Sequence, residues 1–151
     1  MQDGCVVVAD CWNHSLRLIS PCGRFVGTLA GFEGGNESDG YVDGDAESTQ
    51  LDCPVEVCVG FDDSIYFTDN GSKRIRKIKD GMVTTVAGAQ YDHDEEGDLH
   101  VDGHGSEVRF SSSQTYDISC DAIGSLYVCD YQTIRKIDSS GNVTTVVSWR
   151  S

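Results

Sequence analysis

The sequence predicts an all-β fold made of repeated, four-stranded antiparallel units. The phrase SKRIRKIKDGMVTTVAG at residues 72–88 returns as QTIRKIDSSGNVTTVVS at residues 132–148, and a weaker copy, SLRLISPCGRFVGTLAG, occupies residues 15–31. Each copy follows an apolar run that ends in aspartate, at Asp10, Asp69 and Asp130. Repetition at a spacing of about 60 residues indicates a fold in which each unit buries its apolar face against its neighbours.

The middle copy, residues 54–88, shows the strands of one complete unit. Its four β-branched or aromatic runs are residues 54–60, 65–69, 74–78 and 82–86. Turn residues separate these runs, and Asn70-Gly71 is among the strongest hairpin signals. Four short strands joined by tight turns predict an antiparallel meander.

The other copies define the extent of the repeat. The third unit, residues 114–147, repeats the same order of strands, whereas the first, residues 5–31, begins at its second strand. Residues 32–53 and 89–113 are expected to be loops between units. A helical reading fails because glycine or Asp-Gly interrupts every run. Four-stranded units repeated radially are the blades of a β-propeller, so the fold class is a partial propeller with two full blades plus one incomplete.

These phrases in combination resemble the NHL repeat. After Val-Thr-Thr-Val, or Val-Gly-Thr-Leu in the first copy, comes a Val-Asp-Gly loop with an apolar residue seven positions on: Val42-Asp43-Gly44 is followed by Leu51, and Val101-Asp102-Gly103 by Phe110. The resemblance covers nearly the whole chain. It implies a propeller, usually six-bladed, used mostly as an interaction platform, and this chain supplies only part of one.

The charge balance narrows the range of partners. Asp and Glu number 25 against 11 Lys and Arg, a formal net charge of −14. Such a field repels nucleic acid and anionic lipid and favours cationic partners or metal ions. No apolar run reaches the ~18 residues of a membrane span, and the first ten residues lack the features of a signal peptide. We therefore expect a soluble protein; its compartment is unknown, with an intracellular one favoured.

Seven cysteines, an odd number, leave at least one thiol unpaired within the chain. They are Cys5, Cys11, Cys22, Cys53, Cys58, Cys120 and Cys129. Their spacing contains no CxxC pair and no zinc pattern. Cys58 and Cys120 lie in apolar, strand-like runs, where cysteine behaves as a small buried hydrophobe. Core packing is the favoured interpretation, with disulfides and catalysis as alternatives.

An acidic loop contains the densest set of possible metal ligands. Counted from Asp92, the residues Asp92, Asp94 and Glu96 fall at positions 1, 3 and 5 of an EF-hand loop. Position 12 is Gly103 instead of a bidentate glutamate, and neither flank reads as a helix. A solvated loop is favoured, and no cofactor is expected. Calcium remains the alternative, with these candidate ligands: Asp92, Asp94, Glu96 and Asp98.

Three histidines in the same region are possible zinc ligands by residue type, but their spacing does not match a zinc site. His93, His100 and His104 fit neither HExxH nor a zinc finger, so surface positions are favoured.

The basic cluster of Lys73, Arg74, Arg76, Lys77 and Lys79 suggests a nucleic-acid patch in isolation. Two of the five recur as Arg135-Lys136 within the repeated strand, so the repeat itself explains them and nucleic acid is not an expected partner.

All four asparagines, Asn13, Asn36, Asn70 and Asn142, begin Asn-x-Ser/Thr sequences. Turn preference explains these positions without glycosylation, which matters only in a secreted protein.

The function expected is that of a non-catalytic scaffold that binds a protein or peptide through loops at one end. The alternatives are a metal-dependent propeller hydrolase or lyase and an RNA-binding propeller. The missing blades are expected on a longer parent chain, with a closed homodimer as the other possibility.

Overall fold

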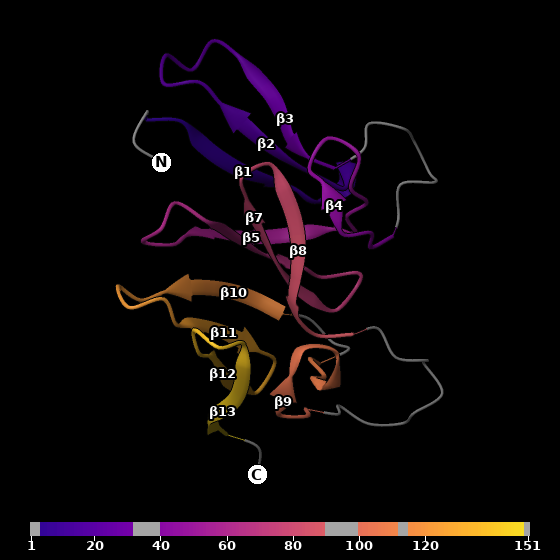
Figure 1. The fold of residues 1–151 in the computed structure, drawn as a ribbon, viewed down its shortest axis with the longest axis vertical. Coiled ribbons are helices and arrows are strands. Elements are labelled where there is room, and N and C mark those ends of the chain that lie inside the picture. The colour runs from indigo at the N-terminus through magenta and orange to yellow at the C-terminus, as the bar shows by residue number, and fades with distance from the viewer. Residues whose placement is uncertain (1–3, 32–39, 90–99, 112–114, 150–151) are drawn as a thin grey trace.

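The computed structural model describes residues 4–31, 40–89, 100–111 and 115–149. Three antiparallel sheets, called blades 1 to 3, are stacked along its long axis (Figure 1). Blade 1 contains β1 (Val6–Asp10), the short 3-10 helix η1 (Cys11–Asn13), β2 (Ser15–Ile19) and β3 (Val26–Ala30). Blade 2 contains β4 (Gly44–Asp45), β5 (Pro54–Val59), β6 (Ile65–Asp69), β7 (Arg74–Lys79) and β8 (Met82–Ala87). Blade 3 contains β9 (Gly103–His104), η2 (Gly105–Glu107), β10 (Thr115–Cys120), β11 (Leu126–Asp130), β12 (Thr133–Ile137) and β13 (Asn142–Ser148).

The all-β, partial-propeller fold class is confirmed. Consecutive strands pair in an antiparallel meander in each blade, β1-β2-β3 in the first, β5-β6-β7-β8 in the second and β10-β11-β12-β13 in the third. Blade 1 lacks an innermost strand within the described residues. A register shift occurs at the same point of all three blades, before Arg17, Arg76 and Arg135. Such a bulge turns the side chain that follows it, and here the same arginine follows each time.

The connecting segments also contribute to the sheets. β4 pairs with β8 on the outer edge of blade 2, and β9 pairs with β13 on the outer edge of blade 3. Each blade with a complete meander therefore has a fifth, two-residue strand that comes from the segment preceding it. This covers part of the outer edge, which would otherwise present unpaired backbone groups.

Apolar side chains form two cores, one at each interface between blades. The first lies between blades 1 and 2 and includes Leu16, Ala30, Ala46, Leu51, Ile65, Phe67, Ile78 and Val83. The second lies between blades 2 and 3 and includes Ile75, Ala87, Val108, Phe110, Ile118, Leu126, Val128, Ile137 and Val143. Leu51 and Phe110, the residues that follow the two Val-Asp-Gly loops, are both fully buried. A blade thus buries its faces against its neighbours, as expected for a repeat fold.

Buried arginines tie each connecting segment to its blade. Arg76 is fully buried and donates to Asp69 Oδ2 at 3.1 Å and to Asp43 Oδ1 at 3.0 Å. Its guanidinium also donates to the carbonyls of Val42 and Gln50. Five donors in a rigid fork suit arginine to such a position.

Blade 3 repeats this arrangement with Arg135. Its guanidinium donates to Asp130 at 2.9 Å, to Asp102 at 2.8 Å and to the carbonyl of Val101. The repeated Ile-Arg-Lys-Ile and Val-Asp-Gly phrases are thus two halves of one structural unit.

A disulfide joins blade 1 to blade 2. It links Cys11, at the hairpin between β1 and β2, to Cys53, immediately before β5. Core packing was the favoured interpretation of the cysteines, and for these two it is wrong. They lie 42 residues apart in the sequence, and only the folding of the two segments onto each other brings them together.

The outer faces of the terminal blades are exposed. Val6 and Val8 point away from blade 2, whereas Val7 and Ala9, which alternate with them, pack against its core. At the other end, Val146 and Val147 of β13 are exposed. No helix among the described residues is long and apolar enough to cross a membrane.

Candidate functional site

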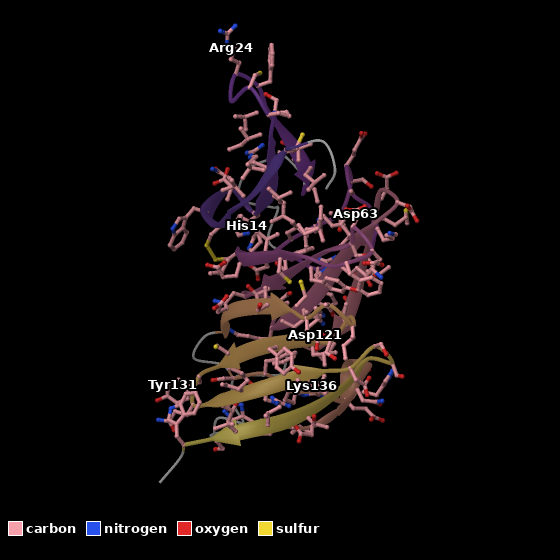
Figure 2. All side chains as sticks on the ribbon, turned by 90° about the vertical axis from the view of Figure 1, so that its left-hand side faces the viewer. His14, Arg24, Asp63, Asp121, Tyr131 and Lys136 are labelled. Atoms are coloured by element: carbon pink, nitrogen blue, oxygen red, sulfur yellow. A yellow bond between two sulfur atoms is a disulfide. The ribbon has the colours of Figure 1, made fainter. Side chains whose placement is uncertain are left out.

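Two hairpin turns, one in blade 2 and one in blade 3, lie on the same side of the stacked blades. The turns between β5 and β6 and between β10 and β11 lie on the left of Figure 1. This is the side that faces the viewer in Figure 2, where Asp63 and Asp121 mark them. Asp62 shapes the first turn by accepting from the Ser64 hydroxyl at 2.8 Å, and Asp121 shapes the second by accepting from the Ser125 backbone N–H, also at 2.8 Å. Both are short turns with a residue at positive φ, Asp63 and Gly124.

The turns expose two large apolar side chains. Phe61 is 71% exposed and Ile123 is 77% exposed. A Cβ atom at Gly124 would come within 2.9 Å of the Phe61 ring, so the ring of blade 2 lies against the turn of blade 3. Glycine at this position permits both the positive φ and the close approach of the ring. Phe61 therefore lies against the residue that follows Ile123, across the interface between the blades, and together we call Phe61 and Ile123 the apolar ridge.

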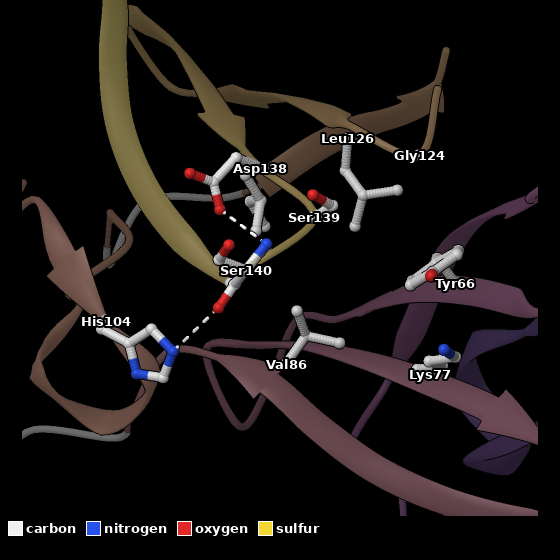
Figure 3. Close-up of a pocket in the computed structure, with 11 residues that line it drawn as sticks. Tyr66, Lys77, Val86, His104, Gly124, Leu126, Asp138, Ser139 and Ser140 are labelled. Atoms are coloured by element: carbon white, nitrogen blue, oxygen red, sulfur yellow. Dashed lines mark hydrogen bonds between the residues drawn. The ribbon is translucent and has the colours of Figure 1, made fainter. Parts of the chain in front are cut away.

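A pocket of about 270 Å³ lies beside the apolar ridge, between blades 2 and 3 (Figure 3). Gly124 belongs both to its lining and to the turn that supports the ridge. Its apolar wall consists of Tyr66, Val86, Leu126 and Ile137, from strands of both blades. We call this space the inter-blade pocket.

The polar wall of the pocket is held by its own hydrogen bonds. His104 Nε2 lies 3.0 Å from the carbonyl oxygen of Ser140, as Figure 3 shows, and Asp138 accepts from the backbone N–H groups of Ser140 and Asn142. These contacts fix the turn between β12 and β13. Lys77, on the opposite wall, lies 5.5 Å from the Tyr66 ring centroid.

Three aspartates lie in turns of blades 2 and 3, and one of them, Asp138, lines the pocket. The Ser64 hydroxyl lowers the pKa of Asp62, and the Ser125 backbone N–H lowers that of Asp121. The Asn142 backbone N–H likewise lowers the pKa of Asp138. All three carboxyl groups are therefore ionised near neutral pH. Lys77 and Lys79, each 3.8 Å from Asp62, offset its charge, and Lys136 acts in the same way on Asp121 and Asp138.

The candidate metal ligands predicted from the sequence do not form a site in the described part of the chain. Asp92, Asp94, Glu96 and Asp98, the calcium candidates, lie outside the described residues, as does His93. His100 lies 2.8 Å from Asp130, whereas His104 contacts Ser140 on a different strand connection. The described residues contain no cluster of three possible metal ligands.

The basic cluster predicted from the sequence is divided among several environments. Arg76 is buried in the interior, and Arg74 stacks over the Tyr41 ring at 3.2 Å while donating to the Ser72 carbonyl. Lys77 and Lys79 both pair with Asp62. These residues form no continuous basic surface.

A second, larger cavity of about 560 Å³ lies on the outer side of blade 2. Tyr41, Asp43, Arg74 and Thr85 line it. Asp43 accepts from Arg76 and Thr85, and Arg74 contacts Tyr41, so the charged groups of this cavity are already engaged within the protein.

The apolar ridge was not predicted from the sequence. Phe61 falls in a predicted turn and Ile123 was not singled out, although each is a large apolar residue beside aspartate or glycine. An apolar residue inside an otherwise polar turn was the available signal. The contact of Phe61 with the Gly124 turn depends on how the blades pack and has no counterpart in the local sequence.

Comparison with known proteins identifies the fold. No family model matches the chain, and no curated protein matches it in sequence. Among solved structures, a structural genomics protein of unknown function from Bacteroides thetaiotaomicron is 27% identical, with a TM-score of 0.74 over 89% of this chain and 32% of that one.

Two other solved structures resemble the chain at lower identity. Virginiamycin B lyase from Staphylococcus aureus, solved with quinupristin, is 14% identical, with a TM-score of 0.60 over 95% of this chain and 37% of that one. A chain of the nidogen/laminin complex is 17% identical, with a TM-score of 0.62 over 98% of this chain and 45% of that one. The neighbours are β-propeller-like, and this chain spans less than half the length of each.

Proposed function

We propose that this chain is part of a non-catalytic, NHL-type β-propeller that binds a protein or peptide partner at the apolar ridge and the inter-blade pocket. The observation that carries the proposal is the contact of Phe61 with the Gly124 turn, which places two exposed apolar side chains beside a pocket. Single exposed apolar residues are ordinary. A pair that spans two blades and borders a pocket has the character of an interface core.

The chemistry of the surface defines the partner that fits it. A volume of about 270 Å³ lies below the ~300–1,000 Å³ typical of small-molecule sites and suits one side chain of a peptide. The wall of Val86, Leu126 and Ile137 favours an apolar side chain. Lysines of the chain already offset Asp62, Asp121 and Asp138, so the preference for lysine or arginine beside the anchor rests on the net charge of −14. The partner is therefore a segment with an apolar anchor flanked by basic residues.

The proposed propeller is not an enzyme. Of the titratable groups that line the pocket, Asp138 and His104 both hold the turn between β12 and β13, and Lys77 lies over the Tyr66 ring. A general acid or base needs a free proton or lone pair directed at the substrate. The likeness to virginiamycin B lyase, at 14% identity, extends to the fold alone.

The remaining blades of the propeller belong, in this proposal, to a longer parent chain. The exposed outer faces of blades 1 and 3 match the surfaces that neighbouring blades would cover. The nidogen/laminin neighbour, from a complex of two proteins, is an example of a propeller in a protein assembly. A closed homodimer of this chain is the alternative to a longer parent chain. Sedimentation of the purified chain would detect such a dimer.

The proposal is tested by selecting peptides from a random display library on the wild-type chain and measuring the binding of the enriched sequences by fluorescence polarisation. Apolar residues flanked by Lys or Arg are expected. Phe61→Ala combined with Ile123→Ala is expected to weaken binding about tenfold or more, as for a hot-spot pair. Phe25→Ala is the matched control, because Phe25 is 72% exposed but lies on blade 1. Equal binding by the double variant, or enrichment of acidic peptides, would overturn the proposal.

A further inference from the structure

Two cysteine thiols meet at the interface between blades 2 and 3. Cys58 lies on β5 and Cys120 on β10, which are the innermost strands of the two blades and lie side by side (Figure 1). Both side chains are half-buried and pack against the same apolar core. The Cys120 thiol donates to the carbonyl oxygen of Val59, the residue after Cys58, at 3.0 Å. Its sulfur has therefore crossed the interface to the backbone of the opposite blade.

The two thiols also interact with each other. Burial raises the pKa of Cys58, and the Cys120 thiol across the interface raises this pKa further. The charge of Asp117, on β10, adds a smaller effect in the same direction. Cys58 is thus protonated at neutral pH, and its partner across the interface is another cysteine.

We infer that Cys58 and Cys120 are an oxidation site, at which a disulfide joins blade 2 to blade 3. The inference is independent of the proposed binding function. It gives the second interface the same kind of covalent link that Cys11–Cys53 gives the first. With both links present, β5 and the residue that precedes it connect all three blades covalently.

The reaction is thiol–disulfide exchange with a small-molecule disulfide such as oxidised glutathione. The sulfur of Cys120 attacks one sulfur of glutathione disulfide, the S–S bond of the reagent breaks, and one glutathione thiol leaves. The Cys58 thiol then gives up its proton, its sulfur attacks the sulfur of Cys120, and the glutathione that leaves takes up a proton to become a thiol. The two cysteines lose two electrons and two protons in total, and one molecule of glutathione disulfide is reduced to two thiols.

Cys22 supplies an internal comparison. It is exposed, and a hydrogen bond with the Ser20 hydroxyl lowers its pKa. An exposed thiol with a lowered pKa reacts readily. Because Cys22 has no cysteine partner among the described contacts, glutathione is expected to remain attached to it, whereas the Cys58–Cys120 pair ends free of glutathione.

The test is incubation of the folded wild-type chain with oxidised glutathione, followed by alkylation, digestion without reductant and mass spectrometry. The expected product is a linked peptide pair containing Cys58 and Cys120, lighter by two hydrogens than the reduced peptides. Cys58→Ser is expected to leave glutathione on Cys120, and Cys129→Ser, which removes a half-buried thiol of β11, is expected to leave the link intact. The oxidised chain should also melt roughly 4–16 °C higher than the same chain with this link reduced.

Three outcomes would overturn the inference. Cys58 and Cys120 could both be recovered as alkylated thiols, each could carry its own glutathione, or either could be linked to another cysteine instead. The wild-type map alone decides among these results, so the conclusion does not depend on whether the serine variants fold.

Discussion

Arg76 Nη2 and Asp43 Oδ1 lie 3.0 Å apart, although 33 residues separate them in the sequence. Arg135 and Asp102 repeat the pair at 2.8 Å with the same separation. Each aspartate also accepts from the backbone N–H and hydroxyl of a threonine on the outermost long strand, Thr85 or Thr145. The connecting segment is in this way held by two strands of the blade that follows it.

Replacement of Arg76 by alanine should strongly destabilise the fold. The side chains of Arg76 and Asp69 are both fully buried, so the substitution leaves a buried carboxylate without its cation. Removing one partner of a buried ion pair costs about 3–5 kcal/mol. Urea unfolding of the variant measures the loss, and Arg24→Ala, at an exposed turn, should change stability by no more than about 0.5 kcal/mol. A loss below about 1 kcal/mol for Arg76→Ala would contradict the structural role assigned to this residue.

Stability should decline in acid. Burial raises the pKa of Asp102, but hydrogen bonds from Thr145 and Arg135 outweigh this effect and lower it overall. A carboxyl group with a lowered folded pKa stabilises the fold above its unfolded pKa of about 3.9 and loses this contribution as the pH falls. The melting temperature should therefore fall as the pH drops below about 4.

The acid dependence can be assigned with matched variants. Asp102→Asn should melt lower than wild type at pH 7 and show a shallower decline between pH 5 and 3, because the titrating group is gone. Asp80→Asn, at an exposed turn position, should preserve the wild-type profile. Parallel wild-type and Asp102→Asn profiles would exclude Asp102 as a contributor.

The isolated chain should associate or aggregate at micromolar concentration. Blade 1 lacks an inner strand within the described residues, and Val6 and Val8 expose its outer face. An open strand edge beside apolar side chains favours association. Val6→Lys with Val8→Lys should reduce association in sedimentation velocity, whereas Val42→Lys, on a connecting segment, should not. A wild-type chain that sediments as a single monomer with a cooperative thermal transition would show that these blades are stable without partners.

Calcium should not raise the melting temperature. An EF-hand loop that starts at Asp92 would need a bidentate carboxylate at the position of Gly103, and Gly103 is instead paired with Val143 in the sheet of blade 3. Calorimetry should detect no site of micromolar affinity in wild-type protein. A micromolar site that Asp94→Ala abolishes would show that other oxygen ligands complete the coordination.

The repeated phrases were sufficient to predict the blades because their signals are local. Alternating β-branched residues and the Asn70-Gly71 turn specify strands and hairpins without reference to distant residues. Leu51 and Phe110, which the repeated phrases mark as apolar positions at a fixed distance from Val-Asp-Gly, are both fully buried in the structure. Local pattern and observed fold therefore agree wherever the pattern is repeated.

Contacts between blades were not accessible in this way. Cys11 and Cys53, or Phe61 and the Gly124 turn, meet only because two units pack face to face. The function of Asp43 was also hidden, since its loop phrase gave no indication that Arg76 would be its partner. Such pairs depend on how the units stack against one another. No local pattern in the sequence indicates this stacking.

The fifth strand makes each complete blade one continuous segment of the chain. All the pairing of blade 2 lies between Gly44 and Ala87, and all that of blade 3 between Gly103 and Ser148. No sheet shares a strand with its neighbour, because β4 and β9 close the blades that follow them. A genetic duplication of the stretch from Gly40 to Ala89 would consequently add one whole blade with its own buried arginine, and a deletion of the same stretch would remove one, without leaving any strand unpaired in the blades that remain.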